Sequence, residues 1–319
     1  MAEKIGLFGD MVVFSSYAMQ IIMSFLMLAM IFMMLPRAEV SAERINEVLD
    51  TEISIKDGKV NKDLTEERGT VEFKNVSFKY PDADEYLLKD ISFKANKGET
   101  VAFIGSTGSG KSTLINLVPR FYDVTDGEIL IDGVNVKDYT QEFLHNKLGY
   151  VSQKAVIFND TVKNNVSYGE NGKGEISEEK IKKAIEVAQG KEFIEKMENQ
   201  YDTEMSQGGT NVSGGQKQRI SIARAIARDP EIYIFDDSFS ALDYKTDSVL
   251  RKELKKYTKD ATTLIVAQRI GTIMNADKII VLDEGKVVGM GTHKELLKNC
   301  PVYEQIALSQ LSKEELENE

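Results

Sequence analysis

The chain has 319 residues, which is enough for one or two domains with a substantial hydrophobic core. Its 40 basic and 51 acidic side chains give a net charge of −11 at pH 7, and this acidic balance argues against a nucleic-acid-binding surface. A single cysteine, Cys300, excludes an internal disulfide and fits a reducing compartment.

The first feature along the chain is a long apolar run. No charged residue occurs between Met11 and Leu35, and a helix of this length spans about 37 Å, enough to cross a hydrocarbon core of about 30 Å. We therefore predict a transmembrane helix in residues 1–36. A secretory signal peptide is one alternative, although Glu3 and Asp10 precede the run and no small-residue cleavage site follows it. A buried helix of a soluble core is the other alternative.

Residues 37–69 are predicted to connect this helix to the rest of the chain. Apolar Ile45, Val48 and Leu49 are spaced three and four residues apart along the sequence, which is typical of an amphipathic helix. The polar stretch that follows contains an Asp57-Gly58 turn and has the composition of a linker.

The remaining residues, 70–319, are predicted to form a folded domain. Strands over 71–80 and 87–95 precede the apolar run Thr100–Ile104, which is a further strand. Two later apolar runs of strand length suit a parallel sheet covered on both faces, namely residues 231–235 and 262–266. The other predicted elements are strands over 128–132 and 148–152, helical stretches around 181–188 and 194–197, a helix over 221–228, and a hairpin of 278–282 and 286–288.

A glycine-rich stretch follows the strand Thr100–Ile104. It satisfies the P-loop pattern G-x-x-x-x-G-K-[ST], and its residues are Gly105, Ser106, Thr107, Gly108, Ser109, Gly110, Lys111, Ser112 and Thr113. Glycines let backbone N–H groups converge on an anion, and the N-terminus of the next helix adds the positive end of its dipole. Lys111 would then reach the β- and γ-phosphates, and the Ser112 hydroxyl would bind Mg²⁺. The alternative is a glycine-rich turn with an exposed lysine, which the flanking strand and helix disfavour.

Two further features extend the predicted nucleotide site. Asp236 closes the strand Ile232–Phe235, the position at which P-loop enzymes place a carboxylate that holds Mg²⁺ directly or through water. Ser213, Gly214 and Gly215 precede a helix and form a second helix start able to bind an anion. For this second feature alone, plain helix capping is an equally good interpretation.

Taken in order, these motifs resemble the nucleotide-binding domain of ATP-binding cassette (ABC) transporters. The ordered set is Gly105–Thr113, Gln153, Val212–Gln216, Ile232–Asp236 and Ser240–Asp243. The resemblance runs from about Val71 to the C-terminus, and the preceding segment is similar to the last transmembrane helix of the exporter type. It implies an α/β P-loop NTPase fold of the ABC type, with a mixed sheet core, an antiparallel β subdomain and a helical signature subdomain, preceded by one transmembrane helix.

The resemblance also implies a role for each motif. Tyr80 is similar to the aromatic residue that stacks on adenine, and Gln153 is similar to the glutamine that senses Mg²⁺ and the transmembrane domains. The signature segment, which contacts the γ-phosphate bound by the opposite subunit, corresponds to Val212, Ser213, Gly214, Gly215 and Gln216. The loop that crosses the dimer interface corresponds to Ser240, Ala241, Leu242 and Asp243. A head-to-tail dimer would sandwich two ATP molecules.

Two residues depart from the family's pattern. The family has Glu after the Mg²⁺ carboxylate, as general base toward the attacking water, whereas this chain has the shorter Asp237. A misplacement of about 1 Å can cost about a hundredfold in rate. The family has His after the strand Thr262–Val266, whereas this chain has Gln268, which can donate a hydrogen bond but cannot carry charge or move a proton as His can. Asp237, Gln268 and Gln153 are the candidate catalytic residues.

The two departures together resemble the degenerate-site subunit of heterodimeric multidrug-type exporters. Such a subunit would hydrolyse ATP slowly at its own P-loop, while its signature segment completes the competent site of a partner. A homodimer with two weakened sites and a mainly regulatory ATP-binding module are the alternatives. A soluble cassette protein of DNA repair or translation is disfavoured by the uncharged run and the acidic balance.

We therefore predict an ATP-binding and ATP-hydrolysing subunit of an ABC exporter. The expected ligands are ATP and Mg²⁺, the latter at Ser112, Gln153 and Asp236. The expected partners are a second half-transporter, the transmembrane domains and membrane lipid, with no nucleic acid, and the nucleotide-binding domain is expected on the cytoplasmic side of the cell membrane. Because a single spanning helix cannot line a transport pathway, the chain is expected to be a fragment or part of a split protein.

Overall fold

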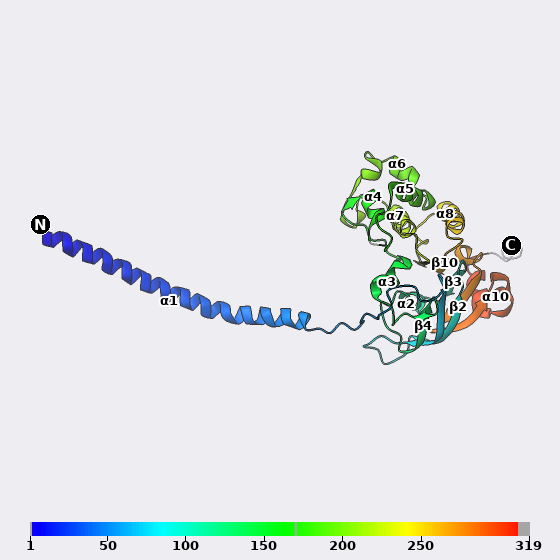
Figure 1. Cartoon of the computed structure of the whole chain (residues 1–319), viewed down its shortest axis with the longest axis horizontal. Coiled ribbons are helices and arrows are strands. Elements are labelled where there is room, and N and C mark those ends of the chain that lie inside the picture. Colours follow the sequence, from blue (N-terminus) through cyan, green and yellow to red (C-terminus); the bar gives the residue numbers. More distant parts are fainter. Residues whose placement is uncertain (1, 170, 312–319) are drawn as a thin grey trace. The chain divides into compact units, whose positions relative to one another are not determined.

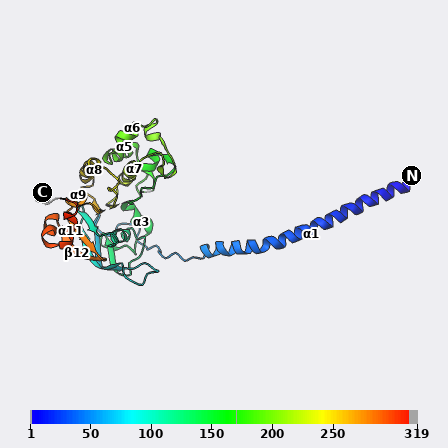
Figure 2. The ribbon, with the colours of Figure 1, turned by 180° about the vertical axis from the view of Figure 1, so that it is seen from behind.

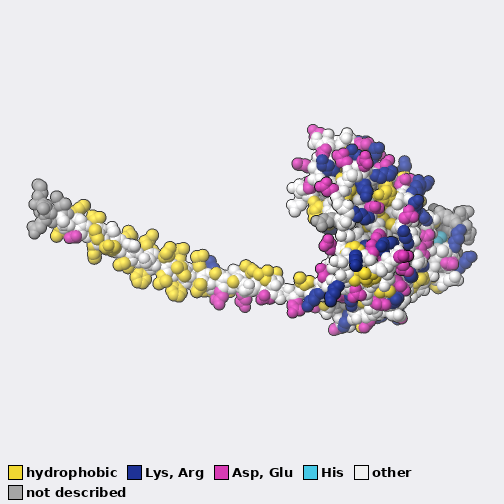
Figure 3. All heavy atoms as spheres, in the orientation of Figure 1, with side chains coloured by type: hydrophobic (Ala, Val, Ile, Leu, Met, Phe, Trp, Pro, Cys, Tyr) yellow, Lys and Arg dark blue, Asp and Glu magenta, His cyan; other side chains and the backbone are white. Residues whose placement is uncertain are grey.

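The computed structural model describes residues 2–169 and 171–311, and the chain divides between Lys56 and Asp57 into two units. The first unit contains one long helix, α1 (Ala2–Leu49). Its large apolar side chains are exposed, as in Phe14 at 77% and Phe32 at 68%, and Figure 3 shows them as a mostly yellow surface along the helix. By length and composition, α1 is able to cross a membrane.

The helix α1 continues through Pro36, where the sequence pattern predicts a change of element. Residues 37–49 are therefore the end of α1, and the expected amphipathic helix is not a separate element. A proline has a backbone φ that suits a helix, and its cost is one lost N–H donor and crowding against the preceding turn. The apolar residues Ile45, Val48 and Leu49 of this part are exposed.

The second unit is organised around a six-stranded sheet, shown in Figure 1 with its helices. The strand order is β12-β11-β3-β10-β9-β6, and every neighbouring pair is parallel except β11 and β12. The strands are β3 (Thr100–Gly105), β6 (Leu148–Val151), β9 (Ile232–Asp236), β10 (Thr262–Val266), β11 (Lys278–Asp283) and β12 (Lys286–Gly291). Parallel strands place their carboxyl ends at one edge of the sheet, and that edge receives the P-loop and Asp236.

Two smaller sheets are antiparallel. The larger has the order β2-β1-β4-β5, with β1 (Val71–Phe78), β2 (Leu88–Ala95), β4 (Asp126–Ile131) and β5 (Val134–Asn135). The other pairs β7 (Asp160–Thr161) with β8 (Glu204–Met205). The first of them is the expected antiparallel β subdomain.

Most of the helices fall into two groups. Those of the helical lobe, gathered at one side of the second unit in Figures 1 and 2, are α4 (Val162–Ser167), α5 (Glu178–Val187), α6 (Lys191–Glu195) and α7 (Gly214–Ala227), with the short turns η1 (Gln200–Asp202) and η2 (Gln207–Gly209). Those of the sheet region are α2 (Lys111–Asn116), α3 (Gln141–Asn146), α9 (Ile270–Ile273), α10 (His293–Asn299) and α11 (Pro301–Leu308). The remaining helix, α8 (Tyr244–Tyr257), contacts α5 and lies beside the helical lobe in both views. The predicted α/β fold with mixed sheet, antiparallel subdomain and helical subdomain is confirmed.

The central strands separate two hydrophobic cores. Along β3, Ala102 and Ile104 pack with the helical lobe, whereas Val101 and Phe103 pack with α2 and the antiparallel sheet. All four side chains are at most 1% exposed. This burial explains the continuous apolar run in the sequence, since a strand covered on both faces has no polar side.

The segment 57–69 belongs to the second unit, although its composition is that of a linker. The N–H group of Gly58 donates to the carbonyl of Tyr139 at 2.9 Å, and that of Val60 donates to the carbonyl of Asp138 at 2.8 Å. The boundary of the compact unit therefore lies before Asp57 and not at residue 70. Contacts with residues about eighty positions away place this segment, so local composition carries no sign of them.

A buried charge cluster centred on Lys147 reinforces this attachment. The Lys147 side chain is 4% exposed, and its Nζ lies 2.7 Å from Asp63, 2.9 Å from Asp132 and 2.9 Å from Glu231. Burial works against the ammonium charge, but the hydrogen bonds to the three carboxylates outweigh it and raise the pKa of Lys147. One cation thus links the segment 57–69 to the ends of β4 and β9.

Replacing Lys147 by Met is expected to lower the free energy of unfolding by about 3–5 kcal/mol, because three carboxylates lose the partner they share in a partly buried site. Urea unfolding of the full chain in detergent, followed by tyrosine fluorescence, measures the change. Lys74→Met is the control, since the ion pair of Lys74 with Glu128 is exposed and is expected to contribute less than about 1 kcal/mol. Equal losses for the two variants would contradict a special role of the cluster.

Candidate functional site

The P-loop connects the end of β3 to the start of α2, as the sequence predicts. Gly110 occupies the N-cap of α2 with a φ of 94°, a left-handed conformation that favours glycine. A Cβ at Gly105 would lie 2.0 Å from the carbonyl oxygen of Leu282, so this position has no room for a side chain. Because the cap has no side chain, no side-chain oxygen caps the first N–H groups of α2. The loop can therefore receive an anionic ligand such as a phosphate.

The Lys111 side chain lies along this loop. Its Nζ donates to the carbonyls of Gly105 at 2.8 Å and Ser106 at 2.7 Å. Burial lowers the pKa of Lys111, and the negative charges of Asp237 and Asp236 oppose that effect. The ammonium group therefore lies against the loop backbone, where it can neutralise phosphate charge.

Asp236 ends β9 and lies beside the P-loop helix. The Ser112 hydroxyl donates to Asp236 Oδ1 at 2.8 Å, which joins two of the residues predicted to hold Mg²⁺. Burial raises the pKa of Asp236, the Ser112 hydrogen bond opposes the rise, and the charge of Asp237 adds to it. A hydroxyl oxygen and a carboxylate are oxygen ligands of the kind Mg²⁺ takes, usually together with phosphate oxygens and water, so the residues fit this ion.

The three candidate catalytic residues meet at one oxygen atom. Asp237 Oδ2 accepts hydrogen bonds from Gln153 Nε2 at 3.1 Å and from Gln268 Nε2 at 2.7 Å. Burial raises the pKa of Asp237, and the hydrogen bonds donated by Gln153 and Gln268 oppose the rise. The Gln153 amide thus donates to the carboxylate that directly follows Asp236.

The backbone of Asp237 has an unusual conformation. Its φ of 46° lies in the left-handed region, which Asp tolerates better than most residues. Its N–H donates to the carbonyl of Val266 at 2.9 Å, and its own carbonyl accepts from Ser240 Oγ at 2.8 Å. The position of the carboxylate is therefore fixed by contacts from β10 and from the loop that follows β9.

Tyr80 lies next to the P-loop helix, through a hydrogen bond between its hydroxyl and that of Thr113 at 3.0 Å. Its ring meets Tyr122 edge to face at a centroid distance of 5.2 Å. The sequence does not single out Tyr122, although the adjacent aromatic pair Phe121-Tyr122 is a signal that could have indicated an aromatic contact here. The two rings offer an aromatic surface beside the phosphate-binding loop.

The signature segment Val212–Gln216 begins α7 in the helical lobe. Ser213 and Gln216 form a reciprocal capping box, with Gln216 N donating to Ser213 Oγ at 3.3 Å and Ser213 N donating to Gln216 Oε1 at 2.8 Å. Gly214 is exposed, and a Cβ there would meet no atom within 4 Å. Within residues 2–169 and 171–311, no hydrogen bond joins this segment to the P-loop. The surface of Gly214 is therefore open to an external partner.

The loop Ser240–Asp243 lies between Asp237 and α8. The carbonyl of Ala241 would lie 3.2 Å from a Cβ at Gly215, so this loop touches the start of α7. Leu242 is buried, and Asp243 caps α8 by accepting a hydrogen bond from Thr246 N at 3.0 Å. The loop thus connects the candidate catalytic carboxylate with the signature segment of the same chain.

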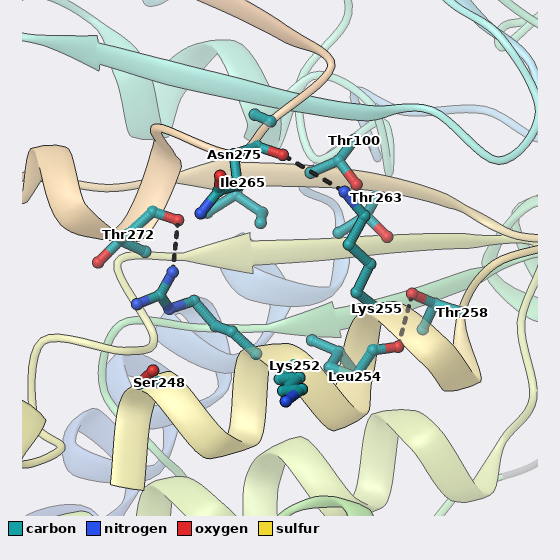
Figure 4. Close-up of a pocket in the computed structure, with 12 residues that line it drawn as sticks. Thr100, Ser248, Lys252, Leu254, Lys255, Thr258, Thr263, Ile265, Thr272 and Asn275 are labelled. Carbon is teal, nitrogen blue, oxygen red and sulfur yellow. Dashed lines mark hydrogen bonds between the residues drawn. The ribbon is translucent and has the colours of Figure 1, made fainter. Parts of the chain in front are cut away.

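Figure 4 shows a separate cavity of about 400 Å³, formed by α8, α9 and the starts of β3 and β10. Arg251 donates to the carbonyl of Thr272 at 3.3 Å, and Lys255 to that of Asn275 at 3.5 Å. Thr100 and Thr263 line it at the amino ends of their strands, whereas the P-loop and Asp236 follow the carboxyl ends. This cavity is therefore not part of the candidate nucleotide site.

The chain is similar to ABC transporter proteins by three comparisons. The family model described as ABC transporter matches residues 88–240. An uncharacterized ABC transporter ATP-binding protein of Mycobacterium tuberculosis is 45% identical over 303 residues, which are 95% of this chain and 52% of that protein. A second uncharacterized ABC transporter ATP-binding protein, from Bacillus subtilis, is 43% identical over 307 residues, which are 96% of this chain and 52% of the relative.

A solved structure has the same fold. It is a bacterial Atm1-family ABC exporter with ATP bound, 35% identical in sequence, and it aligns with a TM-score of 0.82 over 93% of this chain and 52% of that one. The chain thus spans about half the length of the curated relatives and the solved structure that it matches.

Proposed function

Since this chain carries an ABC transporter ATP-binding domain, homologous to the nucleotide-binding domains of ABC exporters, we propose that it is the ATP-binding and ATP-hydrolysing subunit of an exporter. Closure of a dimer around ATP would drive substrate export across the membrane that α1 enters. The similarity to the Atm1-family exporter supports export, and the apolar surface of α1 supports membrane insertion.

The observation that carries the proposal is the division of the site between two lobes. Ser112 and Asp236 are hydrogen-bonded and with Lys111 would form one half of a nucleotide site, whereas the exposed Gly214 at the start of α7 would offer a second surface for an anion. A head-to-tail dimer would bring the signature segment of each subunit to the P-loop of the other. ATP would then lie at the interface and favour the closed dimer.

At the P-loop of this chain, each residue would have a separate task. Lys111 and the uncapped N–H groups of α2 would bind phosphate oxygens. Ser112 and Asp236 would hold Mg²⁺, which when bound neutralises charge that develops on those oxygens. Asp237 would accept a proton from the attacking water, while Gln153 and Gln268 hold its carboxylate in place.

We further propose that this P-loop site hydrolyses ATP slowly. The Asp237 carboxylate reaches less far than a Glu carboxylate, and both its hydrogen-bond donors at Oδ2 are uncharged amides. Gln268 cannot transfer a proton. The signature segment has no comparable departure, so it would serve the faster site of a second half-transporter. A homodimer with two weakened sites is the competing arrangement.

Replacing Gly214 by Ala is expected to lower the ATPase rate of the assembled transporter at least about tenfold, because the new methyl group would occupy the surface that meets the partner's nucleotide. The fold is expected to tolerate the change, since a Cβ at Gly214 meets no atom within 4 Å and Ala favours a helix. The assay measures ATPase rate against protein concentration, for this chain alone and mixed with a second half-transporter.

The assay distinguishes the asymmetric dimer from the homodimer with two weakened sites. A chain that is nearly silent alone and becomes fully active only in the mixture supports the asymmetric dimer, whereas fast turnover by the chain alone with second-order concentration dependence supports the homodimer. Full activity of Gly214→Ala in both settings would contradict the composite site. Thermal unfolding of the variant checks that the fold is unchanged.

A further inference from the structure

The side chain of Gln310 spans the loop that carries Gln268. Gln310 Nε2 donates to the carbonyl of Gln268 at 2.8 Å, and Gln310 Oε1 accepts from the N–H of Ile270 at 2.8 Å. One amide group thus binds the backbone on both sides of Arg269, from a position about forty residues further along the chain. The two contacts fix the orientation of the amide, because Ile270 needs an acceptor and Gln268 needs a donor.

This contact completes a helix start that has no cap of its own. Arg269 is the N-cap of α9 and makes no side-chain capping bond. The first N–H groups of a helix lack partners within the helix, and the Gln310 oxygen supplies one for Ile270. On the strand side, the loop is held where the N–H of Ala267 donates to the carbonyl of Phe103 at 3.2 Å.

Gln310 is itself held in place by the preceding helix. Tyr303 and Ala307 of α11 are fully buried in the same core as Ile270 and Ile273. The N–H of Gln310 continues the helical turn by donating to the carbonyl of Ala307 at 3.0 Å. The Gln310 side-chain amide therefore extends from a backbone that the buried helix α11 holds in place.

We propose that Gln310 is a positioning residue that sets the Gln268 amide against Asp237. The Gln268 side chain is exposed and its Nε2 lies 2.7 Å from Asp237 Oδ2. We call the two Gln310 hydrogen bonds, to Gln268 and Ile270, the Gln310 clamp. Because the bond between Gln268 and Asp237 depends on where the Gln268 backbone lies, the clamp would control the position of the carboxylate that acts on the attacking water. The catalytic part of this inference rests on the proposed function, whereas the clamp itself does not.

The test compares three variants of the full chain in lipid nanodiscs. Gln310→Leu removes both hydrogen bonds, and Gln310→Glu keeps an acceptor for Ile270 but loses the donor to Gln268. Gln305→Leu is the matched control, an exposed glutamine on α11. Three quantities are measured: the single-turnover rate of ATP hydrolysis with protein in excess, the Kd for ATP, and the hydrogen exchange of the peptide that contains Ile270.

Gln310→Leu is expected to lower the single-turnover rate about fivefold, equal to about 1 kcal/mol, with the Kd for ATP changed less than about twofold, since the clamp touches no phosphate-binding group. The Ile270 amide is expected to exchange about tenfold faster. Gln310→Glu is expected to slow hydrolysis while Ile270 stays protected. Gln305→Leu is expected to match the unmodified chain.

An unchanged hydrolysis rate in Gln310→Leu would overturn the positioning role even if exchange increases, and an equal loss in Gln305→Leu would do the same. If the unmodified chain binds no ATP, the proposed function fails. In that case, faster hydrogen exchange of the Ile270 amide in Gln310→Leu, but not in Gln310→Glu or Gln305→Leu, would still support the clamp. Unchanged exchange in Gln310→Leu would overturn the clamp.

Discussion

Replacing Lys111 by Ala is expected to raise the Kd of this chain for ATP about a hundredfold, equal to about 2.7 kcal/mol. The Lys111 ammonium reaches the loop carbonyls at 2.7 and 2.8 Å and is the one basic side chain of the P-loop. A hydrogen bond to a charged group contributes about 1.5–3 kcal/mol, and loss of the charge adds to that of the bond. Binding of a fluorescent ATP analogue to the full chain measures the change.

Lys111→Arg is the matched control, because it keeps the positive charge but changes the shape of the donor. It is expected to lose less affinity than Lys111→Ala. Since Lys111 also bonds to the loop backbone, thermal unfolding without nucleotide must accompany both measurements. An unchanged Kd in Lys111→Ala would show that nucleotide does not bind at this loop.

Replacing Asp237 by Glu is expected to raise hydrolysis at this chain's own P-loop about tenfold or more. The extra methylene moves the carboxylate outward by about 1 Å, and a misplacement of that size can lower the reaction rate about a hundredfold. Gln153 and Gln268 are flexible amides and are able to follow it. Single-turnover hydrolysis with protein in excess measures the rate at this site.

Asp237→Asn is the control for this experiment. Asn has nearly the same shape as Asp and also tolerates the left-handed backbone conformation with φ of 46°, but it cannot accept a proton. If Asp237 already acts as an efficient base, Asp237→Asn abolishes turnover and Asp237→Glu brings no gain. That outcome would contradict the slow-site proposal and favour a homodimer with two working sites.

Several parts of the fold could be predicted because their causes are local. Strands buried on both faces are continuous apolar runs, as in Thr262–Val266. The P-loop needs glycine where φ is positive, as at Gly110, and where backbone approaches closely, as at Gly105. The sequence predicts a helix start at Ser213–Gly215 and a helix over 221–228, and the structure joins the two as α7, because the polar residues between them belong to the helix that the Ser213 capping box begins.

The sequence by itself predicted the phosphate-binding residues of the P-loop, since their spacing follows from one strand, one loop and one helix. Only the tertiary structure decided that Gln153, Asp237 and Gln268 share one oxygen, that the segment 57–69 is tied to Lys147, and that Gln310 clamps a loop forty residues away. The physical reason is how far apart in the sequence the contacting residues are. Periodicity and glycine spacing reflect contacts between residues only a few positions apart. A hydrogen bond between distant segments depends on strand order and packing, which leave no local pattern in the sequence.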